Sequence, residues 1–402
     1  MYRQIYQSFR IYHMEHYDIV VIGLGPAGLA FLSSYSGDKR ILAVDSGDIL
    51  SKRDRYDEVS AINGVGGAGL YSDGKFSFFP SGTELWKIDD MKNHMETIKQ
   101  LFAQFGVSEI MENTDENTNG GNVNIEGWIL KQYFSFRIDL ETRIKIIENL
   151  FDKIKNKCNV VIKMQTNVLS IMNGNVINLA SNGGITEEIQ ASKIIMAGGR
   201  FFPLLTKNLP NVFRRIEFGT RIYGSSDTKF YTQFNLLDPK LILREGDIEF
   251  RSFCWCKNGE MVLTNYNGIK TYSGRADISL TNESNFGFNM RFHNDSQELF
   301  KEMFMEPFDL TFEELKEKSK TNNLLQLYIK GIEKLSHVTG NDVFNMRFKG
   351  PTIEGVGYYP QLEPKSLKIV DNDIWTLGDT TGIFRGLVPA MISGYYLADI
   401  FD

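Results

Sequence analysis

The segment YDIVVIGLGPAGLAFLSSY, residues 17–35, constrains the fold of this chain more than any other stretch. Residues 17–22 are mostly aliphatic and β-branched, which favours a buried strand, and glycines then interrupt the run. Helix-forming residues resume over 26–35, and RILAVDSG at 40–47 has the pattern of a second strand. This order predicts a strand–helix–strand unit at the start of an α/β domain.

The glycines of the turn have the spacing of a dinucleotide-binding motif. In such a motif the first glycine permits the tight bend, the second lets backbone approach a phosphate, and the third lets helix pack on strand. The helix N-terminus also offers unpaired N–H groups and about half a positive charge to a pyrophosphate. We therefore expect cofactor contacts at Gly23, Gly25, Pro26, Ala27 and Gly28. The alternative is an α/β turn whose glycines are incidental.

Asp45 lies twenty residues beyond Gly25, at the end of the second predicted strand. A carboxylate at this place accepts hydrogen bonds from the adenosine ribose and would repel a 2′-phosphate. Asp45 and the following Ser46 are therefore predicted cofactor contacts. The segment GVGGAG at 64–69 has the same glycine spacing, but no apolar strand precedes it, so we do not expect a second binding turn there.

The C-terminal segment DNDIWTLGDTTGIFRGLVPAMISGYYLADIF resembles the second signature of FAD-containing oxidoreductases. In that signature a strand ends in Gly-Asp, and the carboxylate holds a ribitol hydroxyl of the flavin. Pro389 suits the first position of the last helix, which leaves free N–H groups at the start of that helix. A positive helix end would stabilise negative charge on the N1–C2=O edge of a reduced flavin. The predicted contacts here are Gly378, Asp379, Gly386, Leu387 and Val388.

Further segments widen this resemblance. GGAGLYSDGKFSF (66–78), RSFCWCKNGEMV (251–262), SNFGF (284–288) and GDTTGIFRGLVPA (378–390) resemble a poorly characterised family of bacterial FAD-dependent dehydrogenases. The resemblance covers nearly all of residues 17–402 and implies FAD as the cofactor. It also implies a Rossmann-like flavin-binding domain with an inserted substrate lobe, similar in plan to the glutathione-reductase and hydroxybenzoate-hydroxylase groups. Additional cofactor contacts are expected at Gly66, Gly67, Ala68, Ser72, Val168, Ala197 and Gly198.

Two features of better understood relatives do not occur in this chain. The Cys-x4-Cys pair of disulfide reductases is absent, and Thr380, Thr381 and Gly382 follow Gly-Asp where aromatic hydroxylases have an Ala-Ala-His type segment. The sequence also contains no second strand–turn–helix pattern for a separate nicotinamide domain. The electron acceptor, whether oxygen, a nicotinamide or a redox protein, therefore stays open.

At 402 residues the chain is long enough for two lobes. We expect an α/β fold: a leader over 1–15, an FAD-binding domain over 16–213 that returns over 351–402, and an inserted β-rich α+β substrate lobe over 214–350. Apolar spacing predicts amphipathic helices over 89–106 and 140–154, and five short β runs fill 159–196, with turn signals at Asn173-Gly174 and at 181–184. In the substrate lobe, Asn258-Gly259 is expected to join two strands as a hairpin, and Thr311 with Glu314 forms a capping-box pattern. The polar segment 112–124 is expected to be a surface loop.

Composition narrows the classes of partner. The net charge of −6 and the pI of about 5.6 argue against nucleic-acid binding, which needs a basic face. Three cysteines are too few for a disulfide framework, which favours the reducing cytoplasm. No long apolar stretch predicts a membrane span, and the opening residues lack the pattern of a signal peptide. The five histidines have no metal-ligand spacing, so no metal is expected.

Several side chains are candidates for the chemistry. Ser72, Asp73 and Lys75 follow a glycine-rich loop that allows close approach to a ligand, and they are the first candidates for a proton acceptor, although the loop could also be a flexible surface turn. Arg385 could anchor a substrate carboxylate or the electron-rich end of the flavin, or form a surface ion pair; Arg251 is equally ambiguous. Cys254 and Cys256 occupy i and i+2 of a predicted strand, where packing is the simpler role and a thiol role stays open.

These features together predict an FAD-dependent oxidoreductase in which a small organic substrate passes a hydride to flavin N5. A flavin monooxygenase is an alternative, which the missing hydroxylase-type segment disfavours. A non-catalytic flavin-binding protein or an RNA-modifying flavoprotein is a second alternative, and the acidic charge weighs against RNA. The substrate, the oligomeric state and covalent attachment of the flavin are open at this point.

Overall fold

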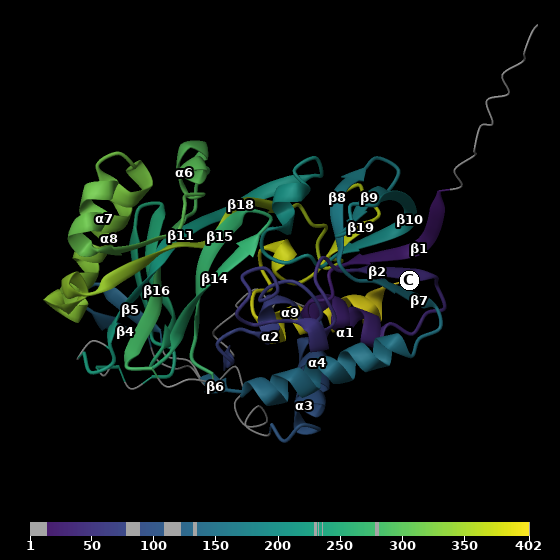
Figure 1. The fold of residues 1–402 in the computed structure, drawn as a ribbon, viewed down its shortest axis with the longest axis horizontal. Helices are drawn as coiled ribbons and strands as arrows, with labels where there is room; N and C mark the ends of the chain where they lie inside the picture. Colours follow the sequence, from purple (N-terminus) through teal and green to yellow (C-terminus); the bar gives the residue numbers. More distant parts are fainter. Residues whose placement is uncertain are drawn as a thin grey trace, which may run out of the picture.

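The computed structural model describes residues 14–77, 89–107, 122–131, 135–228, 231, 233–234, 236–277 and 281–401. They form two lobes, each built around its own sheet, with the N-terminal strands in one lobe and the green mid-chain elements in the other (Figure 1). We call them the first and the second lobe. Most of the expected leader, and residues 112–121 of the expected polar loop, lie outside the described residues.

The first lobe contains a mostly parallel sheet in the order β7-β2-β1-β10-β9-β8, with β19 paired to β10. Its strands are β1 (Glu15–Ile22), β2 (Ile41–Val44), β7 (Val160–Lys163), β8 (Thr166–Met172), β9 (Val176–Ser181), β10 (Thr186–Met196) and β19 (Ile374–Thr376). The pairs β1–β2, β1–β10, β2–β7 and β10–β19 are parallel, whereas β8, β9 and β10 form an antiparallel meander. This confirms the predicted Rossmann-like α/β arrangement, and β19, near the end of the chain, joins the sheet beside β10.

Helices cover one face of the sheet, and strands β8 and β9 of the meander fold over the other face. Four helices share the first core: α1 (Pro26–Ser34), α3 (Met91–Ala103), α4 (Leu140–Lys155) and α9 (Leu387–Ile400). They lie together below the sheet in Figure 1. On the opposite face Val20 and Leu42 pack against Ile177 and Leu179 of the meander. The central strands are therefore buried on both sides, as the continuous apolar run of 17–22 requires.

The second lobe contains an eight-stranded antiparallel sheet in the order β17-β18-β11-β16-β13-β12-β5-β4. Its strands are β4 (Val123–Ile125), β5 (Trp128–Lys131), β11 (Asn211–Ser225), β12 (Lys240–Glu245), β13 (Ile248–Cys256), β16 (Glu283–Phe292), β17 (Phe308–Thr311) and β18 (Arg347–Pro360). Phe218, Phe250 and Phe288 form a core with α7 (Phe312–Ser319) and α8 (Asn323–Thr339). The predicted capping box of Thr311 and Glu314 begins α7. A short helix, α6 (Gln297–Glu302), follows β16.

The second lobe takes in more of the chain than residues 214–350. β4 and β5, which precede residue 214 by about eighty positions, pair at one edge of its sheet through β12, and β18 runs on to Pro360. Two three- to four-residue strands beside a polar segment carry too little local pattern to reveal a partner so far along the chain.

The predicted hairpin across Asn258-Gly259 is wrong. β13 pairs with β12 and β16, whereas β14 (Glu260–Tyr266) pairs with β15 (Ile269–Arg275) in a separate two-stranded sheet. The turn of the β14–β15 hairpin is the next Asn-Gly pair along the chain, Asn267-Gly268, where both residues have positive φ. Identical turn chemistry at two places made the strand partner ambiguous from sequence.

Other local predictions are confirmed. The expected helices at 26–35, 89–106 and 140–154 are α1, α3 and α4, and Asp139 caps α4 by accepting from the Thr142 N–H. Residues 159–196 form four strands, β7 to β10, one fewer than the five short runs expected, and the expected turns lie between β8 and β9 and between β9 and β10. None of the described helices is both long and apolar enough to cross a bilayer.

Lys240 on β12 makes the stability of the fold depend on pH. Burial and then the charge of Arg251 lower the pKa of Lys240 from 10.5 to about 7. Between these values the unfolded chain binds a proton here that the folded chain does not, so the free energy of unfolding rises with pH from about 7 to 10.5. We expect Lys240→Met to flatten this rise in denaturant titrations at pH 7 and pH 10. Lys330→Met, at an exposed lysine of α8, is the control; equal slopes in both variants would contradict the assignment.

Candidate functional site

A cavity of about 370 Å³ lies at the carboxyl ends of β1, β2 and β10 and is closed by the β14–β15 hairpin. Ligands of open α/β sheets bind at this end of the strands. Its wall in the first lobe includes the β1–α1 turn, the end of β2, the glycine-rich segment after residue 62, the start of β8, the end of β10, the Gly378-Asp379 turn and the start of α9. Segments far apart in sequence therefore meet at one cavity.

Most of the predicted site residues line this cavity. Among them are Gly23, Gly25, Pro26, Ala27, Asp45, Ser46, Gly67, Ala68, Ser72, Asp73, Lys75, Val168, Ala197, Gly198, Gly378, Asp379, Arg385, Gly386 and Leu387. Gly28, Gly66 and Val388 are outside this lining set. Asp45 and Asp379, 334 positions apart in the chain (379 − 45), face the same space.

Two glycines of the β1–α1 turn, Gly23 and Gly28, have no room for a side chain. Gly23 has φ 102°, and a Cβ on it would lie 2.4 Å from the carbonyl oxygen of Ala197. A Cβ on Gly28 would lie 2.0 Å from the carbonyl oxygen of Gly23, so the helix can approach the strand only if this residue is glycine. A Cβ on Gly25 would meet nothing closer than 3.9 Å. No described side chain caps α1 at Gly25, so its first N–H groups are available at the cavity.

Asp45 connects three parts of the cavity wall. Its Oδ2 accepts a hydrogen bond from the Leu24 N–H at 2.7 Å, and its Oδ1 accepts from the N–H groups of Gly47 and Gly64, each at 2.8 Å. A carboxylate has about four acceptor positions, so one remains for a ligand hydroxyl. Asp45 is buried at the cavity, and its carboxylate both builds the wall and can contact a ligand.

The glycine-rich segment is more ordered than a surface turn. It contains a one-turn helix, α2 (Gly67–Leu70), that starts after Gly66 at φ 88°. The Gly66 N–H donates to the Leu24 carbonyl at 2.8 Å, which ties the segment to the β1–α1 turn. The buried Arg53 donates hydrogen bonds to the carbonyls of Val65 and Gly67 and so fixes the backbone of this segment. Gly66 thus supports the wall without lining it.

Arg385 joins three carboxylates where the lobes meet. Its guanidinium lies 3.2 Å from Asp379 Oδ2, 2.9 Å from Glu354 Oε2 and 3.2 Å from Glu217 Oε2. Burial alone would raise the pKa of Asp379, but the charges of Arg385, Arg200 and Arg215 outweigh it and lower that pKa. Asp379 is therefore ionised at neutral pH and can accept hydrogen bonds from hydroxyl groups.

Lys75 is enclosed in ion pairs. Its Nζ lies 3.1 Å from Asp73 Oδ2 and 3.0 Å from Asp238 Oδ1, and it donates to the Trp255 carbonyl at 2.6 Å. Burial would lower the pKa of Lys75, but the charges of Asp238 and Asp73 raise it well above its ordinary value. A lysine held protonated in this way donates hydrogen bonds and does not accept a proton at neutral pH.

The cavity also contains residues that the sequence did not point to. Arg200 directly follows the Gly198-Gly199 end of β10, and its position there was a signal that could have been used. Thr264, Tyr266, Thr271 and Ser273 come from the β14–β15 hairpin and carried no such signal. The hairpin reaches the first lobe because the Asn265 N–H donates to the Glu58 carbonyl at 2.8 Å and Arg275 donates to the Arg55 carbonyl at 2.7 Å.

Comparison with known proteins gives similar structures only: no protein-family model and no curated protein sequence matches this chain. Pyridoxine 4-oxidase from Mesorbium loti is 9% identical with a TM-score of 0.46, and the match covers 96% of this chain and 99% of that one. A flavoprotein/dehydrogenase from Cytophaga hutchinsonii is 16% identical (TM-score 0.40; 96% and 77% covered). Glycine oxidase from Geobacillus kaustophilus is 10% identical (TM-score 0.40; 96% and 94%). At these identities the function has to be derived from the chain's own residues.

Two glycine variants separate packing of the turn from access to the cavity. Gly28→Ala places a methyl group against the Gly23 carbonyl and is expected to lose about 3 kcal/mol or more of stability, because overpacking of this kind forces the backbone apart. Gly25→Ala has room for the methyl group and is expected to keep the fold while narrowing the cavity at the start of α1. Thermal unfolding measures the first effect. Equal melting temperatures for the two variants would contradict this account of the turn.

Proposed function

We propose that this chain is an FAD-dependent oxidoreductase that accepts a hydride from a small organic substrate. The observation that carries the proposal is the single cavity lined by both the β1–α1 glycine turn with Asp45 and the Gly378-Asp379 turn with the start of α9. FAD is an extended dinucleotide, and only a long ligand of this kind would use the two ends together. The enclosed flavin supplies the two-electron chemistry, and the protein supplies binding and orientation.

Different residues of the cavity are assigned to different parts of the FAD molecule. The N-terminus of α1 faces the pyrophosphate, and the remaining acceptor position of Asp45 takes a ribose hydroxyl. Asp379 accepts from a ribitol hydroxyl, and Arg385 acts as a positioning residue that keeps its carboxylate in place. No described side chain caps α9 at Gly386, so its N–H groups can face the negative charge of a reduced flavin.

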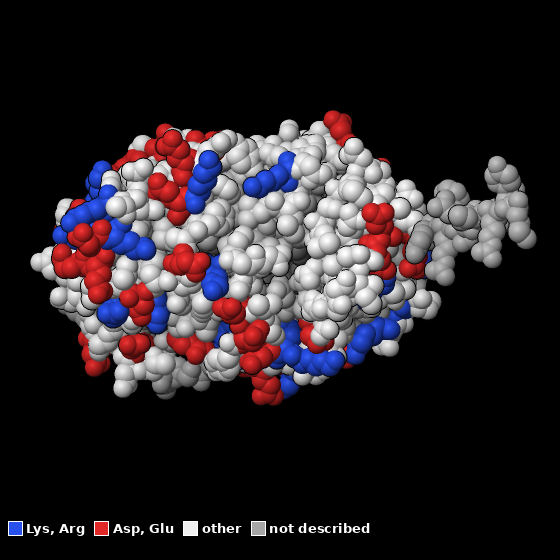
Figure 2. Space-filling view, turned by 45° about the horizontal axis from the view of Figure 1, so that its top comes forward, with Lys and Arg blue, Asp and Glu red and all other residues white. Residues whose placement is uncertain are grey.

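The substrate approaches from the second lobe in this proposal. The β14–β15 hairpin contributes Thr264, Thr271 and Ser273 to the cavity. The Thr264 hydroxyl donates to the Thr271 carbonyl and the Thr271 hydroxyl accepts from the Ile353 N–H, so we expect the Ser273 hydroxyl to contact a polar organic substrate. On the face drawn in Figure 2, basic and acidic side chains are interspersed over the second lobe and do not form one basic surface. This favours a small-molecule substrate over RNA. The electron acceptor is oxygen, a nicotinamide or a redox protein.

The decisive experiment is an absorption spectrum of the purified protein, followed by anaerobic addition of candidate substrates. We expect a flavin spectrum that bleaches with the true substrate and returns with an acceptor. A colourless protein that takes up no FAD on reconstitution would contradict the proposal. Stoichiometric oxygen consumption with an oxygen atom in the product would indicate a monooxygenase. A flavin that no reductant bleaches would indicate a non-catalytic flavin-binding protein.

A variant of Asp379 tests the contact with the flavin. Loss of a hydrogen bond to a charged group costs about 1.5–3 kcal/mol, so Asp379→Asn is expected to weaken FAD binding roughly tenfold or more. Glu354→Gln is the matched control, because Glu354 also pairs with Arg385 but is absent from the residues that line the cavity. Titration of the apoprotein with FAD measures both. Equal losses would show that Asp379 acts only through Arg385.

A further inference from the structure

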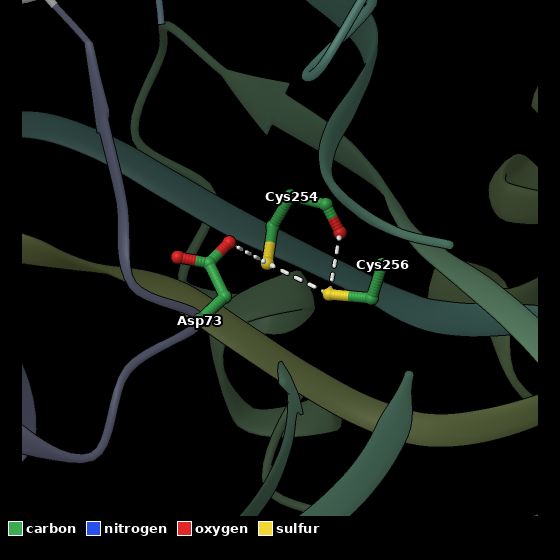
Figure 3. A group of neighbouring side chains, drawn as sticks. All are labelled: Asp73, Cys254 and Cys256. Carbon is green, nitrogen blue, oxygen red and sulfur yellow. Dashed lines mark hydrogen bonds between the residues drawn. The ribbon is translucent and has the colours of Figure 1, made fainter. Parts of the chain in front are cut away.

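Cys254 and Cys256 face each other with 3.7 Å between their sulfur atoms at the end of β13 (Figure 3). Residues i and i+2 of a regular strand point to the same face but are about 6.5 Å apart. Here Cys254 has φ 47°, a left-handed conformation that is rare for residues other than glycine, and the pairing of β13 with β16 shifts register between Phe253 and Cys256. This bulge brings the two thiols together.

The thiol pair is connected to the cavity proposed for FAD. Cys254 Sγ donates a hydrogen bond to Asp73 Oδ2 at 3.0 Å, and Figure 3 shows one oxygen of the carboxylate directed at the Cys254 sulfur. Asp73 lines the cavity, and Lys75 Nζ lies 3.1 Å from the same oxygen. Cys256 is fully buried, whereas Cys254 is partly exposed. One carboxylate therefore separates the thiols from the cavity.

The charges around the pair favour one thiolate and one thiol. Burial would raise the pKa of Cys256, but a hydrogen bond from Cys254 and the charges of Arg221 and Lys75 outweigh it and lower that pKa. The same hydrogen bond, burial and the charge of Asp73 raise the pKa of Cys254 well above its ordinary value. Cys256 is therefore the thiol that ionises first, and the single proton of Cys254 has two acceptors within reach, Asp73 Oδ2 at 3.0 Å and the Cys256 sulfur at 3.7 Å.

The same three groups could be considered as metal ligands, because Asp73, Cys254 and Cys256 place their ligand atoms within 4.8 Å of one another. Two buried cationic side chains, Lys75 and Arg221, already lie beside these three groups. Lys75 pairs with the Asp73 oxygen that faces Cys254, and Arg221 donates to the Cys254 carbonyl at 2.8 Å. Their positive charges would repel a divalent ion, so the arrangement favours chemistry between the thiols.

We propose that Cys254 and Cys256 are a redox-active dithiol that exchanges two electrons with the flavin. A sulfur–sulfur bond forms between them and the S–H bond of Cys254 breaks. The thiolate and the thiol together lose two electrons and one proton, and oxidised FAD gains both as the reduced anion. The hydrogen bond from Cys254 to Asp73, which lines the cavity, gives this proton a path toward the flavin. This inference rests on the proposed binding of FAD.

A reductive titration of the holoprotein tests the proposal. After oxidation with diamide and desalting, anaerobic dithionite should deliver two electrons to the flavin and two more to the disulfide of the wild-type protein. Cys254→Ser and Cys256→Ser should take up half as many electrons per flavin. Cys158→Ser, at an exposed cysteine, should match the wild type. Alkylation and mass spectrometry of the oxidised protein should find the Cys254–Cys256 peptide unlabelled and lighter by two hydrogen atoms.

The outcomes separate this proposal from the one on which it rests. A preparation that binds no FAD contradicts both. A flavin-loaded protein that takes up the same number of electrons with and without the two cysteines contradicts the dithiol alone. Alkylation of both thiols after diamide treatment, or one equivalent of zinc per chain lost in Cys254→Ser, contradicts it as well.

Discussion

The cavity depends first on the carboxylate of Asp45. Its three backbone donors, Leu24, Gly47 and Gly64, belong to the turn after β1, the turn after β2 and the glycine-rich segment. Hydrogen bonds to a charged acceptor in a buried place are among the stronger ones, and without them three buried N–H groups would lack a partner. The Asp45 side chain therefore links three loops into one wall of the cavity, and this link does not depend on a bound ligand.

The two lobes meet through charges more than through a shared apolar core. Their hydrophobic clusters are separate, and the contacts near the cavity include those of Arg385 with Glu217 and Glu354, of Arg143 and Arg55 with Asp277, and of Lys75 with Asp238. Such pairs fix geometry because each guanidinium must be satisfied at several atoms. The reacting end of the proposed flavin would lie at this polar junction, where the second lobe can present a substrate.

Sequence predicted the parts that rest on local pattern. The β1–α1 turn, Asp45 and the amphipathic helices α3 and α4 follow from spacing within a few residues, and the structure has them where expected. It did not predict the partners of β5 or β14, because short strands carry no information about a partner far along the chain. The sequence also did not predict that Lys75 pairs with Asp238, 163 residues away. This pairing holds Lys75 in its protonated form.

The segment after α2 shows how such distant contacts set chemistry. From sequence, Asp73 and Lys75 are equal candidates for a proton acceptor. In the structure Asp238 and Asp73 both stabilise the charge of Lys75, so the lysine is a fixed cation. Asp73 in turn accepts a hydrogen bond from the Cys254 thiol of the second lobe. Asp73 lines the cavity and also contacts the sulfur atom of Cys254. This contact gives a proton leaving Cys254 a path to the cavity, which couples the second lobe to the cofactor site.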